Sequence, residues 1–246
     1  MKGSFLFKKS LGIFVGASLG SYYAYQRKYA TMWTDKGKRV YAWGAGMHGQ
    51  LGLGQEVFSV DIPTEVAELS DKNIVYITAC GDISAALSEE GDIYLFGKTK
   101  GGALGSGGKT FTTNLTLPTL FEFQDLKFKH VSCGKNHVAA VTVDGRVVTW
   151  GNPDNGKLGH GEKDAGKGYK PKNYADRSEI DFVNGELEGK QVKSVECGFN
   201  ITVALTEDGD VYSWGSGKEG ALGHGDWDNC FIPKKVEGIK NIEKIR

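Results

Sequence analysis

The stretch VYAWGAGMHGQLGLG, residues 40–54, places an aromatic residue before a glycine and then sets closely spaced glycines around a leucine. The same pattern, W/F-G-x4-G-x-L-G-x-G, returns with its aromatic residue at Phe96, Trp150 and Trp214, at spacings of 53, 54 and 64 residues. Glycine makes up 36 of the 246 residues, and 16 of these glycines occupy the glycine positions in the four copies of this pattern. Four copies in register predict a repeat protein.

A second motif lies between the copies of the first. It reads CGDISAALSEEG from Cys80, CGKNHVAAVTVDG from Cys133 and CGFNITVALTEDG from Cys197. Each copy holds a short apolar run, then Glu-Gly or Asp-Gly, and a second apolar run follows, which is the strongest local signal for a β-hairpin. No segment after Tyr41 shows sustained helical periodicity. Units of this length, built from short strands and glycine turns, predict blades of a β-propeller.

The alternation of the two motifs from residue 40 to residue 246 resembles the regulator of chromosome condensation repeat family. This resemblance implies a β-propeller, usually of seven blades, that serves as a rigid protein-binding disc. It also implies that some members catalyse guanine-nucleotide exchange on small GTPases and that some are mitochondrial.

We therefore predict an all-β chain with about four propeller repeats, fewer than the seven that the resemblance implies. The repeats are expected at 40–91, 92–145, 146–209 and 210–246. An open arc exposes strand edges and blade faces. We expect either a longer polypeptide or another chain that completes the ring, and a closed four-bladed ring is the least favoured arrangement. The predicted blade core consists of Trp43, Phe96, Trp150, Trp214, Leu51, Leu104, Leu158, Leu222, Cys80, Cys133 and Cys197.

Residues 1–33 have a different character, because no acidic residue precedes Asp35. Seventeen uncharged residues separate Lys9 from Arg27, and as a helix they would span ~26 Å, near the minimum for crossing a bilayer. We predict a targeting segment with a membrane helix at about 10–26, followed by a linker at 34–39. Gly12, Gly16 and Gly20 would form a smooth stripe that packs against another membrane helix.

Localisation follows from this segment. A basic, acid-free leader favours a single-pass protein of the mitochondrial inner membrane. A secretory signal or anchor, and a leader that is removed, are the alternatives. Basic residues on both sides of the apolar stretch leave the orientation open.

Thirty basic residues balance thirty acidic ones, so no overall positive field favours a nucleic-acid partner. No catalytic set, metal site or cofactor site can be assembled, and we predict that the chain is not an enzyme. The cysteine spacings match no zinc pattern, and Cys230 has no assigned role. For His137, His160 and His224, hydrogen bonds that brace turns are the favoured role.

Two segments are candidate interfaces. Residues 161–191 form the longest stretch between motifs and contain Tyr169 and Tyr174. Such an insertion contacts a partner in some relatives, and a solvated surface loop is the plainer interpretation. Trp227, between Asp226 and Asp228, is the second candidate, because an exposed aromatic residue flanked by charge can anchor an interface.

These observations favour a membrane-tethered scaffold or assembly subunit of a mitochondrial complex of the respiratory-chain type. Its expected partners are the lipid bilayer, other membrane protein subunits and a chain that completes the propeller. The alternative function is guanine-nucleotide exchange on a small GTPase, which rests on the family resemblance alone.

Overall fold

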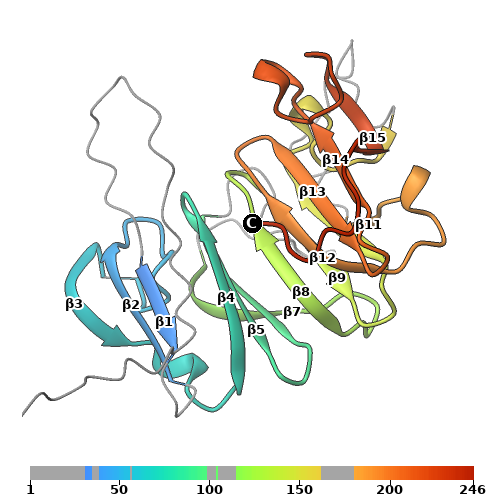
Figure 1. Cartoon of the computed structure of the whole chain (residues 1–246). Coiled ribbons are helices and arrows are strands. Elements are labelled where there is room, and N and C mark those ends of the chain that lie inside the picture. Colours follow the sequence, from blue (N-terminus) through green and yellow to red (C-terminus); the bar gives the residue numbers. More distant parts are fainter. Residues whose placement is uncertain (1–30, 35–38, 56, 99–103, 105–114, 162–179) are drawn as a thin grey trace, which may run out of the picture.

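The computed structural model describes residues 31–34, 39–55, 57–98, 104, 115–161 and 180–246 (Figure 1). The predicted membrane helix, its glycines Gly12, Gly16 and Gly20, and the interface candidates Tyr169 and Tyr174 lie outside these residues. Within the described part of the chain, no helix is long and apolar enough to cross a membrane.

The described residues form four antiparallel sheets, as an all-β propeller requires. The strands are β1 (Thr31–Thr34), β2 (Val40–Ala45), β3 (Ser59–Glu65), β4 (Ile74–Cys80), β5 (Ile83–Ser88), β6 (Ile93–Gly97), β7 (Leu115–Phe121), β8 (Phe128–Cys133), β9 (His137–Thr142), β10 (Val147–Gly151), β11 (Asp181–Phe182), β12 (Val192–Cys197), β13 (Ile201–Thr206), β14 (Val211–Gly215) and β15 (Cys230–Lys235). Short 3-10 helices connect them: η1 (Ala67–Leu69), η2 (Asp154–Gly156), η5 (Gly185–Leu187) and η6 (Lys218–Gly220). The predicted fold class is confirmed.

The first sheet has the order β1-β2-β3, and the others have four strands each, β4-β5-β6-β7, β8-β9-β10-β11 and β12-β13-β14-β15. The inner strands β4, β8 and β12 lie next to one another, and the sheets follow in chain order (Figure 1). Sequence repeats and sheets are offset by half a unit. The repeat at residues 40–91, for example, supplies the two outer strands of the first sheet and the two inner strands of the second.

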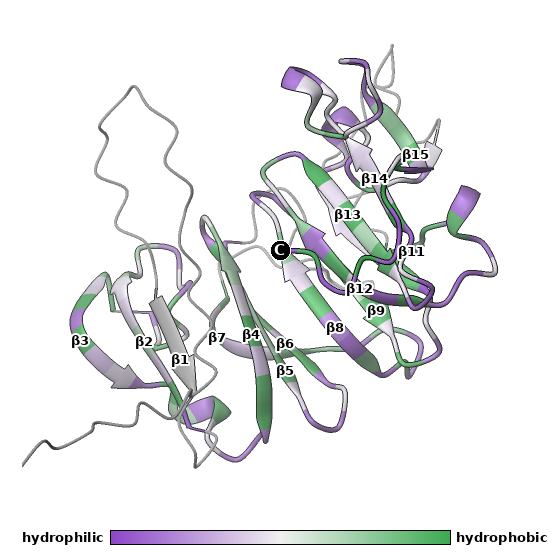
Figure 2. Ribbon diagram, viewed as in Figure 1, coloured by the Kyte–Doolittle hydropathy of each residue, from purple (hydrophilic) through white to green (hydrophobic). Residues whose placement is uncertain are grey.

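The hydrophobic core lies between neighbouring sheets. Strands β5 and β9 are buried along their whole length, and Figure 2 shows most of the hydrophilic colour on the loops and turns. Phe96, Trp150 and Trp214 are fully buried, and Phe121 stacks on Trp150 with ring centroids 4.4 Å apart. Each cluster of buried side chains combines residues from two successive sheets, so packing against its neighbour stabilises every sheet.

The predicted blade-core residues differ in burial. Three of the four aromatic residues, all four leucines and Cys133 are buried, whereas Trp43, Cys80 and Cys197 are only half-buried. Cys133 ends β8, which lies between β4 and β12, so it is covered from both sides. Cys80 and Cys197 end the flanking inner strands, and Trp43 belongs to the first described sheet. Cys80 and Cys197 nevertheless pack against the core clusters of their sheets.

Two of the glycine-rich loops pack onto the aromatic residue of the following sheet. A Cβ atom added to Gly52 would lie 3.1 Å from the ring of Phe96, and one added to Gly159 would lie 2.8 Å from Trp214 Nε1. The indole N–H of Trp214 also donates a hydrogen bond to the Lys157 carbonyl at 3.0 Å. A glycine fits this close approach at a positive φ, which explains Gly52 and Gly159, the glycines after Leu51 and Leu158.

Hydrogen bonds fasten the same loops. The Thr202 hydroxyl donates to the Lys157 carbonyl at 2.8 Å, and the Ser84 hydroxyl donates to the Gln50 carbonyl at 2.8 Å. At the opposite end of the sheets, the carbonyl of each hairpin glycine accepts an N–H from a later segment, which is the first residue of the next inner strand at Phe128 and Val192. These pairs are Phe128 to Gly91 at 2.9 Å, Val192 to Gly145 at 2.9 Å and Ile242 to Gly209 at 3.1 Å. Successive sheets are therefore joined at both ends.

The outer strands β3, β7 and β15 each carry a proline in equivalent register, Pro63, Pro118 and Pro233. Each proline precedes the residue that pairs with the middle of the neighbouring strand. Proline has no N–H to offer to an added strand, so these outer edges resist edge-to-edge pairing.

Replacing Gly159 with alanine should strongly destabilise the fold. The new Cβ would meet Trp214, and Gly159 has a φ of +77°. Steric clash and left-handed backbone together should lower the free energy of unfolding by about 3 kcal/mol. Denaturant titration measures this loss.

Gly225→Ala is the matched control, because Gly225 has a φ of +82° but nothing within 4 Å of an added Cβ. It should cost about 1 kcal/mol, the backbone contribution alone. Equal losses in the two variants would contradict the role assigned to the contact with Trp214.

Candidate protein-interaction surface

One end of the sheets carries the turns that join the two inner strands of each blade, at residues 81–82, 134–136 and 198–200. The long loops that follow the third strand of each blade emerge at the same end, because Ile83 pairs with Gly97 and Ile201 pairs with Gly215. We call this end the loop face. The opposite end, which carries the hairpin turns before β6, β10 and β14, is the turn face.

Polar side chains connect neighbouring sheets across the loop face. Lys98 Nζ lies 3.2 Å from Asp82 Oδ2, and His48 Nε2 lies 3.8 Å from the same oxygen. Farther along, Lys157 Nζ donates to Asn200 Oδ1 at 3.1 Å. These contacts hold the turns in fixed positions relative to one another.

The loop face displays apolar side chains. Phe58 is 65% exposed, Phe199 57% and Trp227 73%, and no other aromatic residue in the described part of the chain is classed as exposed. Phe58 belongs to this end because its carbonyl accepts the N–H of Gly46 at 2.8 Å. Met47, which is 69% exposed, lies in the same loop. Exposed aromatic and methionine side chains on one face are typical of protein-binding surfaces.

Phe199 is held by a neighbour. Lys135 Nζ lies 3.9 Å from the centroid of the Phe199 ring, a cation–π contact between two successive inner turns. Phe199 and Lys135 occupy equivalent positions of the second motif, in Cys-Gly-Phe-Asn and Cys-Gly-Lys-Asn. Only the copy that begins at Cys197 has an aromatic residue at this turn position. The sequence therefore contained a signal for Phe199, and our predicted interface did not include this residue.

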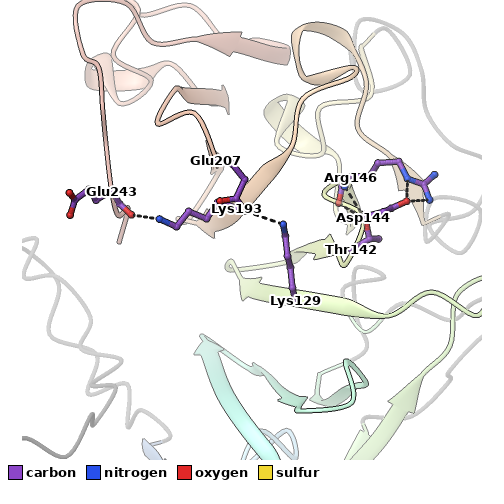
Figure 3. Close-up of polar contacts among 7 residues, drawn as sticks. All are labelled: Lys129, Thr142, Asp144, Arg146, Lys193, Glu207 and Glu243. Carbon is purple, nitrogen blue, oxygen red and sulfur yellow. Dashed lines mark hydrogen bonds and ion pairs between the residues drawn. The ribbon is translucent and has the colours of Figure 1, made fainter.

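The turn face is mainly ionic (Figure 3). Arg146 Nη2 and Nε each lie 2.8 Å from Asp144 Oδ2, and the Thr142 hydroxyl donates to the same carboxylate. Hydrogen bonds from Thr142 and then Arg146 lower the pKa of Asp144. Lys129 Nζ lies 3.3 Å from Glu207 Oε1. These are exposed pairs, and such pairs contribute little to stability.

The histidines of the Leu-Gly-His-Gly sequences brace their loops. The Thr149 hydroxyl donates to the Leu158 carbonyl at 2.7 Å and lies 2.9 Å from His160 Nε2. Because that hydroxyl proton is already used, His160 Nε2 carries the proton and donates to the oxygen. Ser213 and His224 repeat the arrangement in the next sheet at 3.2 Å.

His137 is completely buried, and its Nε2 lies 3.0 Å from Thr202 Oγ1. Burial, together with the nearby positive charge of Lys157, lowers the pKa of His137 to about 3. Burial also raises the pKa of the Cys133 and Cys197 thiols, which disfavours the reactive thiolate. In the described residues, no three His, Cys, Asp or Glu side chains are placed to hold a metal ion.

Comparison with known proteins agrees with this architecture. A family model described as RCC1-like domain matches residues 29–246, so the chain belongs to this family. The resemblance noted in the sequence is confirmed.

Among relatives, the human E3 ubiquitin-protein ligase HERC2 is 36% identical over 213 residues, which cover 84% of this chain and 4% of that protein. The mitochondrial RCC1 domain-containing protein RUG3 of Arabidopsis thaliana is 31% identical over 205 residues, covering 81% and 43%. The chain thus spans less than half the length of these relatives.

Two solved structures share the fold. Human WBSCR16 gives a TM-score of 0.71 at 24% identity, with 84% of this chain and 50% of that chain covered. Prp20p of Saccharomyces cerevisiae gives 0.69 at 22% identity, with 85% and 48% covered.

The buried His137 should make stability dependent on pH. An unfolded histidine binds a proton below pH 6.5 or so, whereas folded His137 stays neutral down to a pH of about 3. The unfolded state therefore binds more protons between these values, and stability falls as the pH falls. Between pH 7 and pH 4 the loss from this residue should be about 3 kcal/mol, measured by denaturation.

His137→Ile is the informative variant, because Ile83 and Ile201 occupy the equivalent positions in the neighbouring sheets. It should flatten the pH profile. His130, whose pKa burial lowers to about 4, should account for the remaining slope. Parallel profiles for the two proteins would show that His137 is not the titrating group.

Proposed function

We propose that this chain is a non-enzymatic interaction scaffold, tethered to a membrane and serving as an accessory or assembly subunit of a mitochondrial complex of the respiratory-chain type. The observation that carries the proposal is the concentration of exposed aromatic side chains on the loop face. Contacts within and between sheets hold in place the loops and turns that carry Phe58, Phe199 and Trp227. A rigid surface with exposed aromatic anchors suits protein binding.

The polar groups of the loop face support binding over catalysis. Lys98 and His48 both approach the Asp82 carboxylate, and Lys157 and Asn200 are hydrogen-bonded across two sheets. These side chains hold loops together and do not converge on a reaction centre.

The membrane and mitochondrial parts of the proposal rest on other grounds. Residues 1–33 are basic and contain no acidic residue, and RUG3, a relative at 31% identity, is described as mitochondrial. Extraction of isolated mitochondria with alkaline carbonate tests this part, and an anchored protein should remain with the membranes.

Guanine-nucleotide exchange on a small GTPase is the second candidate. Prp20p, which shares the fold at 22% identity, was described together with its binding properties to Gsp1p and histones. An exchange factor binds the nucleotide-free GTPase most tightly, so its partner should leave when GTP or GDP is added. A scaffold should keep its partners under the same conditions.

Site-specific photo-cross-linking should locate the working surface. A photoreactive residue at Phe199 or Met47 of the full chain should give discrete cross-links to partner subunits in mitochondria. The same residue at Ile62, on outer strand β3, is the matched control, because Ile62 is 66% exposed but lies away from the loop face. Ile62 should give few cross-links.

Equal cross-linking from positions 62 and 199, or none from either, would overturn the loop face as the interaction surface. Cross-links from position 199 that disappear when nucleotide is added would replace the scaffold with the exchange factor.

A further inference from the structure

Trp227 lies outside both repeated motifs, in the loop between β14 and β15. The other tryptophans with described side chains, Trp43, Trp150 and Trp214, all belong to the first motif, whereas Trp227 is 73% exposed. The repeat architecture therefore gives no reason for a tryptophan at this position.

The loop that carries Trp227 is fastened on both sides of the ring. The Asp228 N–H donates to Asp226 Oδ1 at 3.1 Å, and the Gly217 N–H donates to Asn229 Oδ1 at 3.1 Å. Gly217 lies so close to the Asp228 carbonyl that an added Cβ would lie 1.8 Å from its oxygen. The loop backbone that carries the indole is thus held in a defined place, which lowers the entropy that binding would cost.

Three acidic residues lie close to Trp227 in the chain or next to a residue that approaches its ring. Asp226 and Asp228 flank it in the chain, and Glu219 precedes Gly220, whose added Cβ would lie 3.9 Å from Trp227 Nε1. Lys218 is the one lysine or arginine in residues 216–229, and it is exposed. The face of an indole is itself negative, so ring and carboxylates both favour a cation.

The same chain holds an arginine in this way elsewhere. The Arg146 guanidinium carbon lies 4.1 Å from the centroid of the Phe182 ring, and two of its nitrogens lie 2.8 Å from Asp144 Oδ2. An aromatic face and a carboxylate thus bind one guanidinium together. Trp227, Asp226 and Asp228 offer both groups at the surface.

We propose that Trp227, Asp226 and Asp228 form a binding site for an arginine side chain in a basic segment of a partner protein. The guanidinium lies over the indole and donates hydrogen bonds to the carboxylates. Arginine fits better than lysine, because its planar group stacks on the ring while its N–H groups point outward to the acids. The site deepens the proposed scaffold function and rests on it.

The test uses the full chain labelled with 5-fluorotryptophan, with the Trp227 fluorine signal assigned by its loss in Trp227→Phe. An acetylated peptide of four arginines alternating with glycines is titrated in, beside matched lysine, citrulline and glutamate peptides. The arginine peptide should shift the Trp227 signal saturably. The lysine peptide should bind several-fold more weakly, and the citrulline and glutamate peptides should cause no shift.

Variants make the test specific to the site. Trp227→Ala and the double variant Asp226→Asn with Asp228→Asn should each weaken binding of the arginine peptide tenfold or more by calorimetry. Ile62→Ala is the matched control, since it removes an exposed apolar residue that lies away from the loop face, and it should leave the affinity unchanged.

Unchanged affinity in Trp227→Ala, or equal binding of the citrulline peptide, would overturn the arginine site. If that happens while cross-links from position 199 persist, the scaffold function stands and this site alone is rejected. If the peptide binds as expected but position 199 gives no cross-links, the scaffold function fails.

Discussion

The contact between a glycine-rich loop and the aromatic residue of the next sheet is the constraint on which the structure depends. Gly159 touches the indole of Trp214, and that indole donates to the carbonyl of Lys157, two residues before the glycine. The Thr202 hydroxyl donates to the same carbonyl. One short loop thus combines close packing with two hydrogen bonds to the neighbouring sheet, and Gly52 and Phe96 repeat the packing part. An isolated sheet would leave its aromatic residue exposed to water, so the sheets are stable only together.

Much of this could be predicted from sequence, because the loop contact uses residues at fixed spacing. The aromatic residue, the leucine and the glycine after it recur in four copies, and their regularity indicated the propeller. The offset between repeat and sheet could not be predicted, since periodicity gives the length of a unit and not the place where one sheet ends. Trp43, Cys80 and Cys197 are less buried than the equivalent residues of the other copies for a related reason. Equivalent positions in a repeat have equal surroundings only when both neighbours are equivalent.

The candidate surface was harder to predict. Trp227 could be identified because it departs from the motif, whereas Phe199 lies within a motif and was taken as part of the repeat. Its exposure follows from its place at a turn tip, where the side chain extends over Lys135 and away from the core. The prolines of the outer strands complement this arrangement. Pro63, Pro118 and Pro233 oppose strand addition at three outer edges, and the loops carry the surface that we propose for partner recognition.

The half-unit offset between repeat and sheet also bears on how such a chain changes in evolution. The segment 146–209 carries the loop with Lys157 together with β13, whose Thr202 hydroxyl donates to the Lys157 carbonyl. Trp214, which Gly159 contacts in the same joint, lies in the segment that follows. A tandem duplication of one repeat therefore copies the hydrogen-bonded part of a joint between sheets, and each copy meets the aromatic residue of the copy that follows. Arcs of different length can thus arise by tandem gain or loss of a segment whose ends are already compatible.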